Sequence, residues 1–129
     1  MIKKFLFFIF FNCVLFVNTF SQILRPIEWS YVVDKKQLNV GDSITLTFIA
    51  EIEESWYLYS FGNNDINSEL SPTFIFNKRD TYALIDDVIP INPKTKYDSI
   101  WEGNVRYFDR EAKFIQKISV LSKTPFVPP

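Results

Sequence analysis

Apolar side chains recur at every second position along most of the chain beyond its first twenty-odd residues, and this period predicts β-strands rather than helices. The clearest stretch is residues 43–52, where one face is apolar and the other mostly polar. The apolar face consists of Ile44, Leu46, Phe48, Ala50 and Ile52. A preceding strand is predicted over Ile27–Val33, and the turn-forming sequence Asn-Val-Gly-Asp at 39–42 separates the two.

Five further segments have the length and the bounding turn residues of short strands. They are Trp56–Phe61, Thr73–Phe76, Tyr82–Ile89, Ile100–Phe108 and Ala112–Leu121. A polar loop at 62–69 and a break over 90–93, before residues 94–98, separate some of them, and no segment predicts a helix. About seven short strands in roughly 100 residues are typical of an immunoglobulin-like fold. We therefore predict a single domain that is all-β, an immunoglobulin-like antiparallel β-sandwich.

The first 21 residues have the features of a secretory signal peptide. Lys3 and Lys4 precede an apolar run over 5–17, and Thr19 and Ser21 supply small residues before a cleavage site. The alternative is a retained membrane anchor, but the run falls short of the roughly 20 apolar residues that span a bilayer. We therefore expect export, removal of residues 1–21 and a folded domain over 22–129.

The residue types limit the chemistry of the chain. Its 129 residues include no histidine and a single cysteine, Cys13, within the apolar run. This composition excludes Ser-His-Asp and Cys-His catalytic units and ordinary zinc sites, so we expect no catalytic residue, no metal and no other cofactor. With 14 basic and 15 acidic side chains, the chain has no positive surplus for nucleic acid. Residues 22–129 contain no cysteine, so packing has to stabilise the domain without disulfides.

Two groups of oxygen-bearing side chains allow alternative interpretations. The first, with the alternation that suits calcium, comprises Asn63, Asp65, Asn67 and Glu69. The second, with potential carboxylate pairs for glycoside hydrolysis, comprises Glu51, Glu53, Glu54, Asp86 and Asp87. The first group lacks the glycine and the final carboxylate of a helix-flanked calcium loop, and the second belongs to no motif. A solvated loop and charges that keep strand edges soluble explain them more simply.

The segment 56–61 is rich in aromatic side chains. A strand here places one set of side chains on each face, and the two sets are Tyr57, Tyr59 and Phe61 against Trp56, Leu58 and Ser60. In one interpretation, one row belongs to the core and the other forms a stacking surface for a ligand. In the other, a central strand has core on both faces, and the sequence leaves both interpretations open.

Several of these segments together resemble a known family. They are residues 56–60 (Trp-Tyr-Leu-Tyr-Ser), 72–74 (Pro-Thr-Phe), 96–98 (Lys-Tyr-Asp) and 105–108 (Val-Arg-Tyr-Phe), which lead into 112–118. Over residues 22–124 the pattern is similar to the N-terminal periplasmic domain of the thiol:disulfide interchange protein DsbD, in its Bacteroidetes-type form. The resemblance implies an immunoglobulin-like fold in the periplasm. It also implies transfer of electrons from a membrane-embedded partner domain to other periplasmic thiol proteins.

The chain departs from that family in its reactive residues. The family carries a cysteine pair near the C-terminus of the domain, and exchange requires a thiolate that attacks a disulfide sulfur. Residues 22–129 contain no such pair, so we expect a truncated or split relative of the disulfide reductases, unable to exchange disulfides alone. The family also shields its cysteines with an aromatic cap loop, and Tyr97 and Trp101 fall near that place. Together with Tyr57 and Tyr59 they make up the expected cap-like or partner surface.

Two functions of different classes follow. The chain is either this redox-related periplasmic domain, with periplasmic thiol–disulfide proteins as partners, or a cysteine-free periplasmic binding module for a peptide, glycan or partner protein. Membrane contact is expected only through the signal peptide or a membrane-embedded partner.

The sequence that follows 112–121 bears on the completeness of the sandwich. It contains Pro125, Pro128 and Pro129, and proline does not donate to a strand ladder. We therefore expect the sandwich to lack its last strand. The resulting open edge invites a strand-donating partner or a second copy of the chain.

The signal-peptide interpretation predicts that the exported protein begins at Gln22. N-terminal sequencing and intact-mass measurement of the exported product check this expectation. A full-length 15.2 kDa species embedded in the membrane contradicts it.

Overall fold

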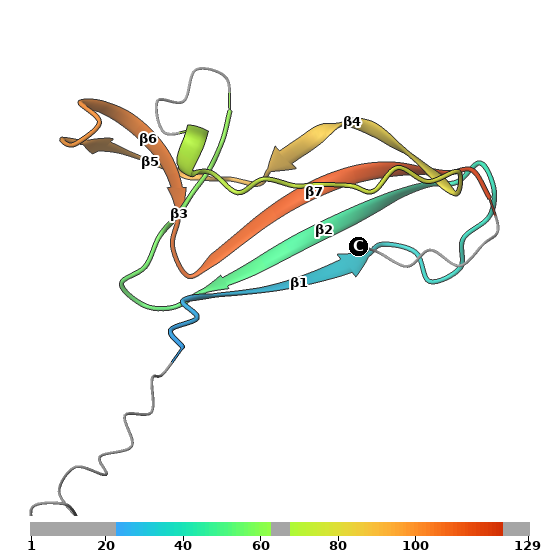
Figure 1. Cartoon of the computed structure of the whole chain (residues 1–129), viewed down its shortest axis with the longest axis horizontal. Coiled ribbons are helices and arrows are strands. Elements are labelled where there is room, and N and C mark those ends of the chain that lie inside the picture. Colours follow the sequence, from blue (N-terminus) through green and yellow to red (C-terminus); the bar gives the residue numbers. More distant parts are fainter. Residues whose placement is uncertain (1–22, 63–67, 123–129) are drawn as a thin grey trace, which may run out of the picture.

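Two antiparallel sheets make up the computed structural model, which describes residues 23–62 and 68–122 (Figure 1). The large sheet has the order β1-β2-β7-β4, with β1 at Ile27–Val33, β2 at Ser43–Ile52, β7 at Glu111–Val120 and β4 at Tyr82–Pro90. The small sheet has the order β3-β6-β5, with β3 at Leu58–Tyr59, β6 at Gly103–Phe108 and β5 at Lys94–Asp98. The predicted all-β, antiparallel architecture of two sheets is confirmed.

Helical structure is almost absent from the described residues. A short 3-10 turn covers Ser68–Leu70. None of the described segments forms a helix long and apolar enough to cross a membrane. The predicted signal peptide over 1–21 and the prolines at 125, 128 and 129 lie outside the described residues.

The pairing of β2 with β7 forms the centre of the large sheet. On β2, Ile44, Leu46 and Ala50 are buried. On β7 the same alternation buries Ala112, Phe114, Gln116 and Ile118. Partners in the register, such as Ile44 with Ile118 and Ala50 with Ala112, share a face of the sheet. The two rows therefore form one continuous apolar surface, the inner face of the large sheet.

Phe114 occupies the middle of the main core cluster and is fully buried. Its ring centroid lies 5.1 Å from Phe74, 5.3 Å from Phe108, 5.5 Å from Phe61 and 6.0 Å from Trp29. These rings come from β1, β6 and two loops. Aromatic rings at 4.5–7 Å attract one another beyond their burial of apolar area, so Phe114 joins both sheets and the loops between them.

The small sheet packs on one end of the inner face. Leu58 of β3 and Phe108 of β6 are register partners, and both are buried in the cluster that contains Phe114. Figure 1 shows the β5–β6 hairpin projecting beyond the large sheet from this contact. One face of the small sheet therefore contributes to the core, while its opposite face points away from it.

The prediction of a strand over Thr73–Phe76 is wrong. Phe74 and Phe76 are partly buried against the inner face, while Ile75 between them is 78% exposed, so the side chains alternate as in a strand. The backbone, however, belongs to neither sheet. Ring contacts of Phe74 with Phe48 at 4.9 Å and with Phe114 hold the segment in place instead of a hydrogen-bond ladder.

The predicted strand over Ile100–Phe108 is also corrected, because the structure contains a hairpin there. The side chain of Asp98 accepts hydrogen bonds from the backbone N–H groups of Ile100 (2.9 Å) and Trp101 (3.3 Å), and this cap creates a turn. Residues 94–98, which were not predicted as a strand, form β5. The predicted strand over Trp56–Phe61 shortens to the two residues of β3.

A bulge interrupts β4 between Ile85 and Ile89, where the register with β7 shifts. Asp86 has a left-handed φ of 58° there. The buried side-chain amide of Gln116 donates to the carbonyl oxygens of Ile85 and Asp86, both at 3.1 Å. Because the bulge removes these carbonyls from the regular ladder, Gln116 supplies the partner that they would otherwise lack.

Truncation of Phe114 tests the central role of its ring. We expect Phe114→Ala to lower the free energy of unfolding by about 3–5 kcal/mol, because it leaves a cavity among four rings. Urea unfolding followed by tryptophan fluorescence measures the loss. Ile115→Ala is the matched control, since Ile115 is adjacent but only partly buried on the opposite face. An equal decrease in the free energy of unfolding for the two variants contradicts the central role of the Phe114 ring.

Candidate binding surface

The face of the small sheet that points away from the core carries the candidate binding residues. Tyr59 of β3 pairs with Tyr107 of β6, which in turn pairs with Lys94 of β5. Cross-strand partners share a face, so these side chains stand on one surface, opposite to Leu58 and Phe108. Tyr57, directly before β3, joins them through its ring contact with Tyr107.

Tyr57, Lys96 and Tyr107 form a compact group that we call the tyrosine–lysine cluster. The Lys96 Nζ lies 3.8 Å from the centroid of the Tyr57 ring and 4.7 Å from that of Tyr107. The two rings meet edge to face, with centroids 5.6 Å apart. Cation–π contacts at exposed sites contribute about 0.5–1 kcal/mol. These contacts favour one orientation of the Tyr57 ring, although the residue is 52% exposed.

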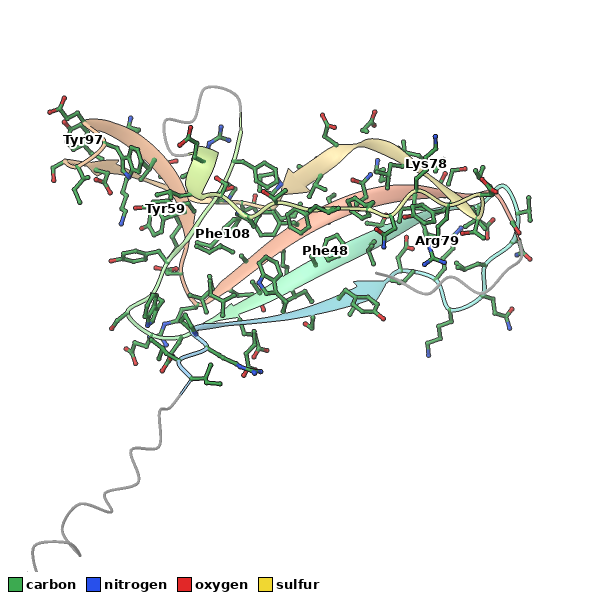
Figure 2. The ribbon with its side chains drawn as sticks, viewed as in Figure 1. Phe48, Tyr59, Lys78, Arg79, Tyr97 and Phe108 are labelled. Atoms are coloured by element: carbon green, nitrogen blue, oxygen red, sulfur yellow. The ribbon has the colours of Figure 1, made fainter. Side chains whose placement is uncertain are left out.

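The structure separates the four residues of the predicted partner surface into two places. Tyr57 and Tyr59 lie at β3, next to Tyr107. Tyr97 is 68% exposed, and its position next to Lys96 directs it to the opposite face of β5. Trp101 lies in the turn beyond β5. Figure 2 shows Tyr97 at the far end of the hairpin from Tyr59 and Phe108.

Sequence reasoning missed Lys96 and Tyr107 as members of the site. Tyr107 lies in the predicted strand over Ile100–Phe108, whereas Lys96 lies in a segment noted only for its resemblance to the family. The signal that identifies them is the hairpin itself, because Asp98 caps a turn between two alternating segments and thereby brings residues 94–98 beside 103–108. Without that turn, nothing in the sequence places Lys96 near Tyr57.

An ion pair fixes the start of β5 against the end of β6. The Lys94 Nζ lies 2.5 Å from Oδ1 of Asp109. This hydrogen bond raises the pKa of Lys94 and holds the pKa of the Asp109 carboxyl below its ordinary value. Both groups are exposed to solvent, so the pair orients the strand ends more than it stabilises the fold.

The other candidate groups lie apart from this surface. Glu51 faces Glu28 on one side and Glu111 on the other across the strands, and all three are exposed. Glu54 forms a 3.1 Å ion pair with Arg110. In the described residues no three acidic, histidine or cysteine side chains group to hold a metal ion. Residues 63–67 of the predicted polar loop lie outside the described part, and Glu69 lies in the 3-10 turn.

Replacement of Lys94 tests the origin of the low Asp109 pKa. We expect Lys94→Met to raise the pKa of Asp109, because the carboxylate loses the hydrogen bond and the charge that favour its ionised form. Any stability that the pair contributes is present above the unfolded pKa of Asp109 and disappears as the pH falls through its lower folded pKa. NMR titration of the side-chain carboxyl measures the shift. Lys96→Met should leave this pKa unchanged, and a similar shift in both variants contradicts the assignment.

The geometry of the tyrosine–lysine cluster is therefore the main basis for a functional argument. Comparison with known proteins gives no match to this chain, whether among family models, curated proteins or solved structures.

Proposed function

We propose that this protein is an exported binding domain that holds a partner protein on its tyrosine–lysine cluster and performs no disulfide exchange by itself. The observation that carries the proposal is the exposed Tyr57 ring, which contacts the ring of Tyr107 and the ammonium group of Lys96.

A fixed aromatic ring suits protein binding for energetic reasons. Tyrosine is enriched at protein interfaces because it offers a large apolar surface together with a hydroxyl group. Ordering a side chain on binding costs about 0.5–1.5 kcal/mol. Since Lys96 and Tyr107 already restrict Tyr57, part of this cost is met before the partner arrives.

The chemistry of the cluster indicates what the partner presents. Tyr57 suits an apolar or aromatic side chain, and the ammonium group of Lys96 suits a carboxylate beside it. The resemblance to the periplasmic domain of disulfide reductases supports an exported thiol–disulfide protein as the partner. The redox step then belongs to that partner, because residues 22–129 contain no cysteine.

Site-specific photocrosslinking in the native host tests the proposal. The photoreactive amino acid p-benzoylphenylalanine replaces Tyr57 in the full chain, and a second strain carries it at Lys117, an exposed position of β7. We expect a discrete adduct with an exported protein at position 57 and none at 117. Equal labelling at the two positions contradicts the proposal.

Two matched tyrosine variants then measure the contribution of the cluster. With the crosslinked protein purified as the probe, we expect Tyr57→Ala to weaken binding roughly tenfold or more, as for an interface hot spot. Tyr97→Ala should leave binding unchanged, since Tyr97 lies on the opposite face of β5. If Tyr97→Ala alone weakens binding, the hairpin end is the contact and the proposal is wrong.

A further inference from the structure

The free edge of β1 has hydrogen-bonding groups that no described strand uses. β1 is the outermost strand of the large sheet and forms its lower border in Figure 1. Hydrogen-bonded and non-hydrogen-bonded pairs alternate along an antiparallel ladder. At its two ends, the carbonyl of Pro26 accepts from Glu53 N–H, and Asp34 N–H donates to the carbonyl of Thr45.

These two bonds determine the direction of every backbone group in the strand. The register between β1 and β2 is unbroken from Ile27 to Val33. The even-numbered residues therefore bond to β2. The N–H and C=O groups of Ile27, Trp29, Tyr31 and Val33 point away from β2, toward the free edge.

The side chains of β1 leave this edge unprotected. Glu28 is its single charged residue, and the strand contains no proline, lysine or bulge. Trp29 and Tyr31 are 47% and 49% exposed although they belong to the inner face. Soluble proteins usually protect an edge with charges, proline or a bulge.

The other outer strands of the two sheets carry such protection. β4, at the opposite border of the large sheet, contains the bulge, Asp86, Asp87 and Pro90. At the two borders of the small sheet, β5 contains Lys94 and Lys96 in only five residues, and β3 is only two residues long. The contrast singles out β1 as the edge that accepts another strand.

We propose that β1 pairs antiparallel with β1 of a second copy of this chain, with Ser30 opposite Ser30 on the two-fold axis. This register places Ile27 opposite Val33 and Trp29 opposite Tyr31. Every outward-pointing residue of β1 then has a partner, and each pair exchanges two backbone hydrogen bonds. The two four-stranded sheets become one continuous sheet across a symmetric interface.

The charges and rings of the strand favour this register over its neighbours. Glu28 lies opposite the exposed Val32 of the second copy, so no like charges meet within the strand. A shift by one pair in one direction brings Glu28 opposite Asp34 and leaves Ile27 without a partner in the strand. A shift by one pair in the other direction brings no like charges together but leaves Val33 without a partner, and a shift by two pairs in that direction brings Glu28 opposite Glu28. In the proposed register Trp29 and Tyr31 form cross-strand aromatic pairs that cover their exposed faces.

Cysteine crosslinking of the exported full chain, in a Cys13→Ser background, tests the register. Ser30 opposite Ser30 is a non-hydrogen-bonded pair, in which Cα atoms lie about 4.5 Å apart, within the range of a disulfide. We expect Ser30→Cys to form a disulfide-linked dimer under mild oxidation. Glu28→Cys and Val32→Cys should crosslink when mixed but not separately, because each lies about 13 Å from its own copy across the axis.

A pair of charge variants at one exposed position provides an independent measurement. Val32→Glu places a carboxylate opposite Glu28 of the second copy, and Val32→Lys places an ammonium group there. By symmetry each change occurs twice, so we expect the dimer dissociation constant of Val32→Glu to exceed that of Val32→Lys by roughly two- to thirty-fold. Sedimentation equilibrium measures both constants, and circular dichroism checks that both variants fold.

The outcomes separate this proposal from the proposed function. A monomer at all concentrations, or a dimer that Ser30→Cys does not crosslink, overturns the pairing of β1. Neither result affects the tyrosine–lysine cluster, which lies on the small sheet and is tested through Tyr57. Crosslinking at Ser30 together with the Glu28–Val32 mixture supports the register.

Discussion

The burial of Phe114 among the rings of Trp29, Phe61, Phe74 and Phe108 is the interaction on which the rest of the structure depends. A domain without disulfides has to hold its loops and its second sheet by packing alone. One ring at the centre of β7 performs this task for several parts of the chain at once. The extended segment around Phe74 and the small sheet both contact the large sheet through this cluster.

The same cluster determines which residues are left for binding. Since Leu58 and Phe108 turn one face of the small sheet into the core, Tyr57 and Tyr107 have to stand on the other. The two border strands of the large sheet, β4 and β1, also differ from each other. Gln116 satisfies the carbonyls of the β4 bulge and so allows one border to be irregular, whereas β1 at the other border stays regular and open. Core packing and the two candidate surfaces are thus consequences of one arrangement.

The sequence predicted the strands whose side chains alternate and whose backbones pair, as in residues 27–33, 43–52 and 112–121. The prediction failed where side chains alternate but the backbone does not pair with another strand. Phe74 and Phe76 alternate with exposed residues as in a strand, yet ring packing rather than a ladder holds them. The β5–β6 hairpin was missed because its turn depends on a hydrogen bond from the backbone to the side chain of Asp98. The spacing of apolar residues gives no sign of such a bond. The position of Lys96 over Tyr57 depends on that hairpin. The hydrophobic pattern of the sequence therefore does not predict the tyrosine–lysine cluster.

The central place of β7 has a consequence for how the chain folds. β7 is the last described strand in the sequence, yet it lies between β2 and β4, with Ser43 opposite Ser119. Contacts between residues so distant along the chain have to overcome a large loop-closure entropy, and they slow folding. During synthesis the β1–β2 hairpin forms without its principal core residue, and the cluster closes only after residues beyond 110 have emerged. The aromatic cluster that joins the two sheets therefore cannot form until β7 is available for pairing with β2 and β4.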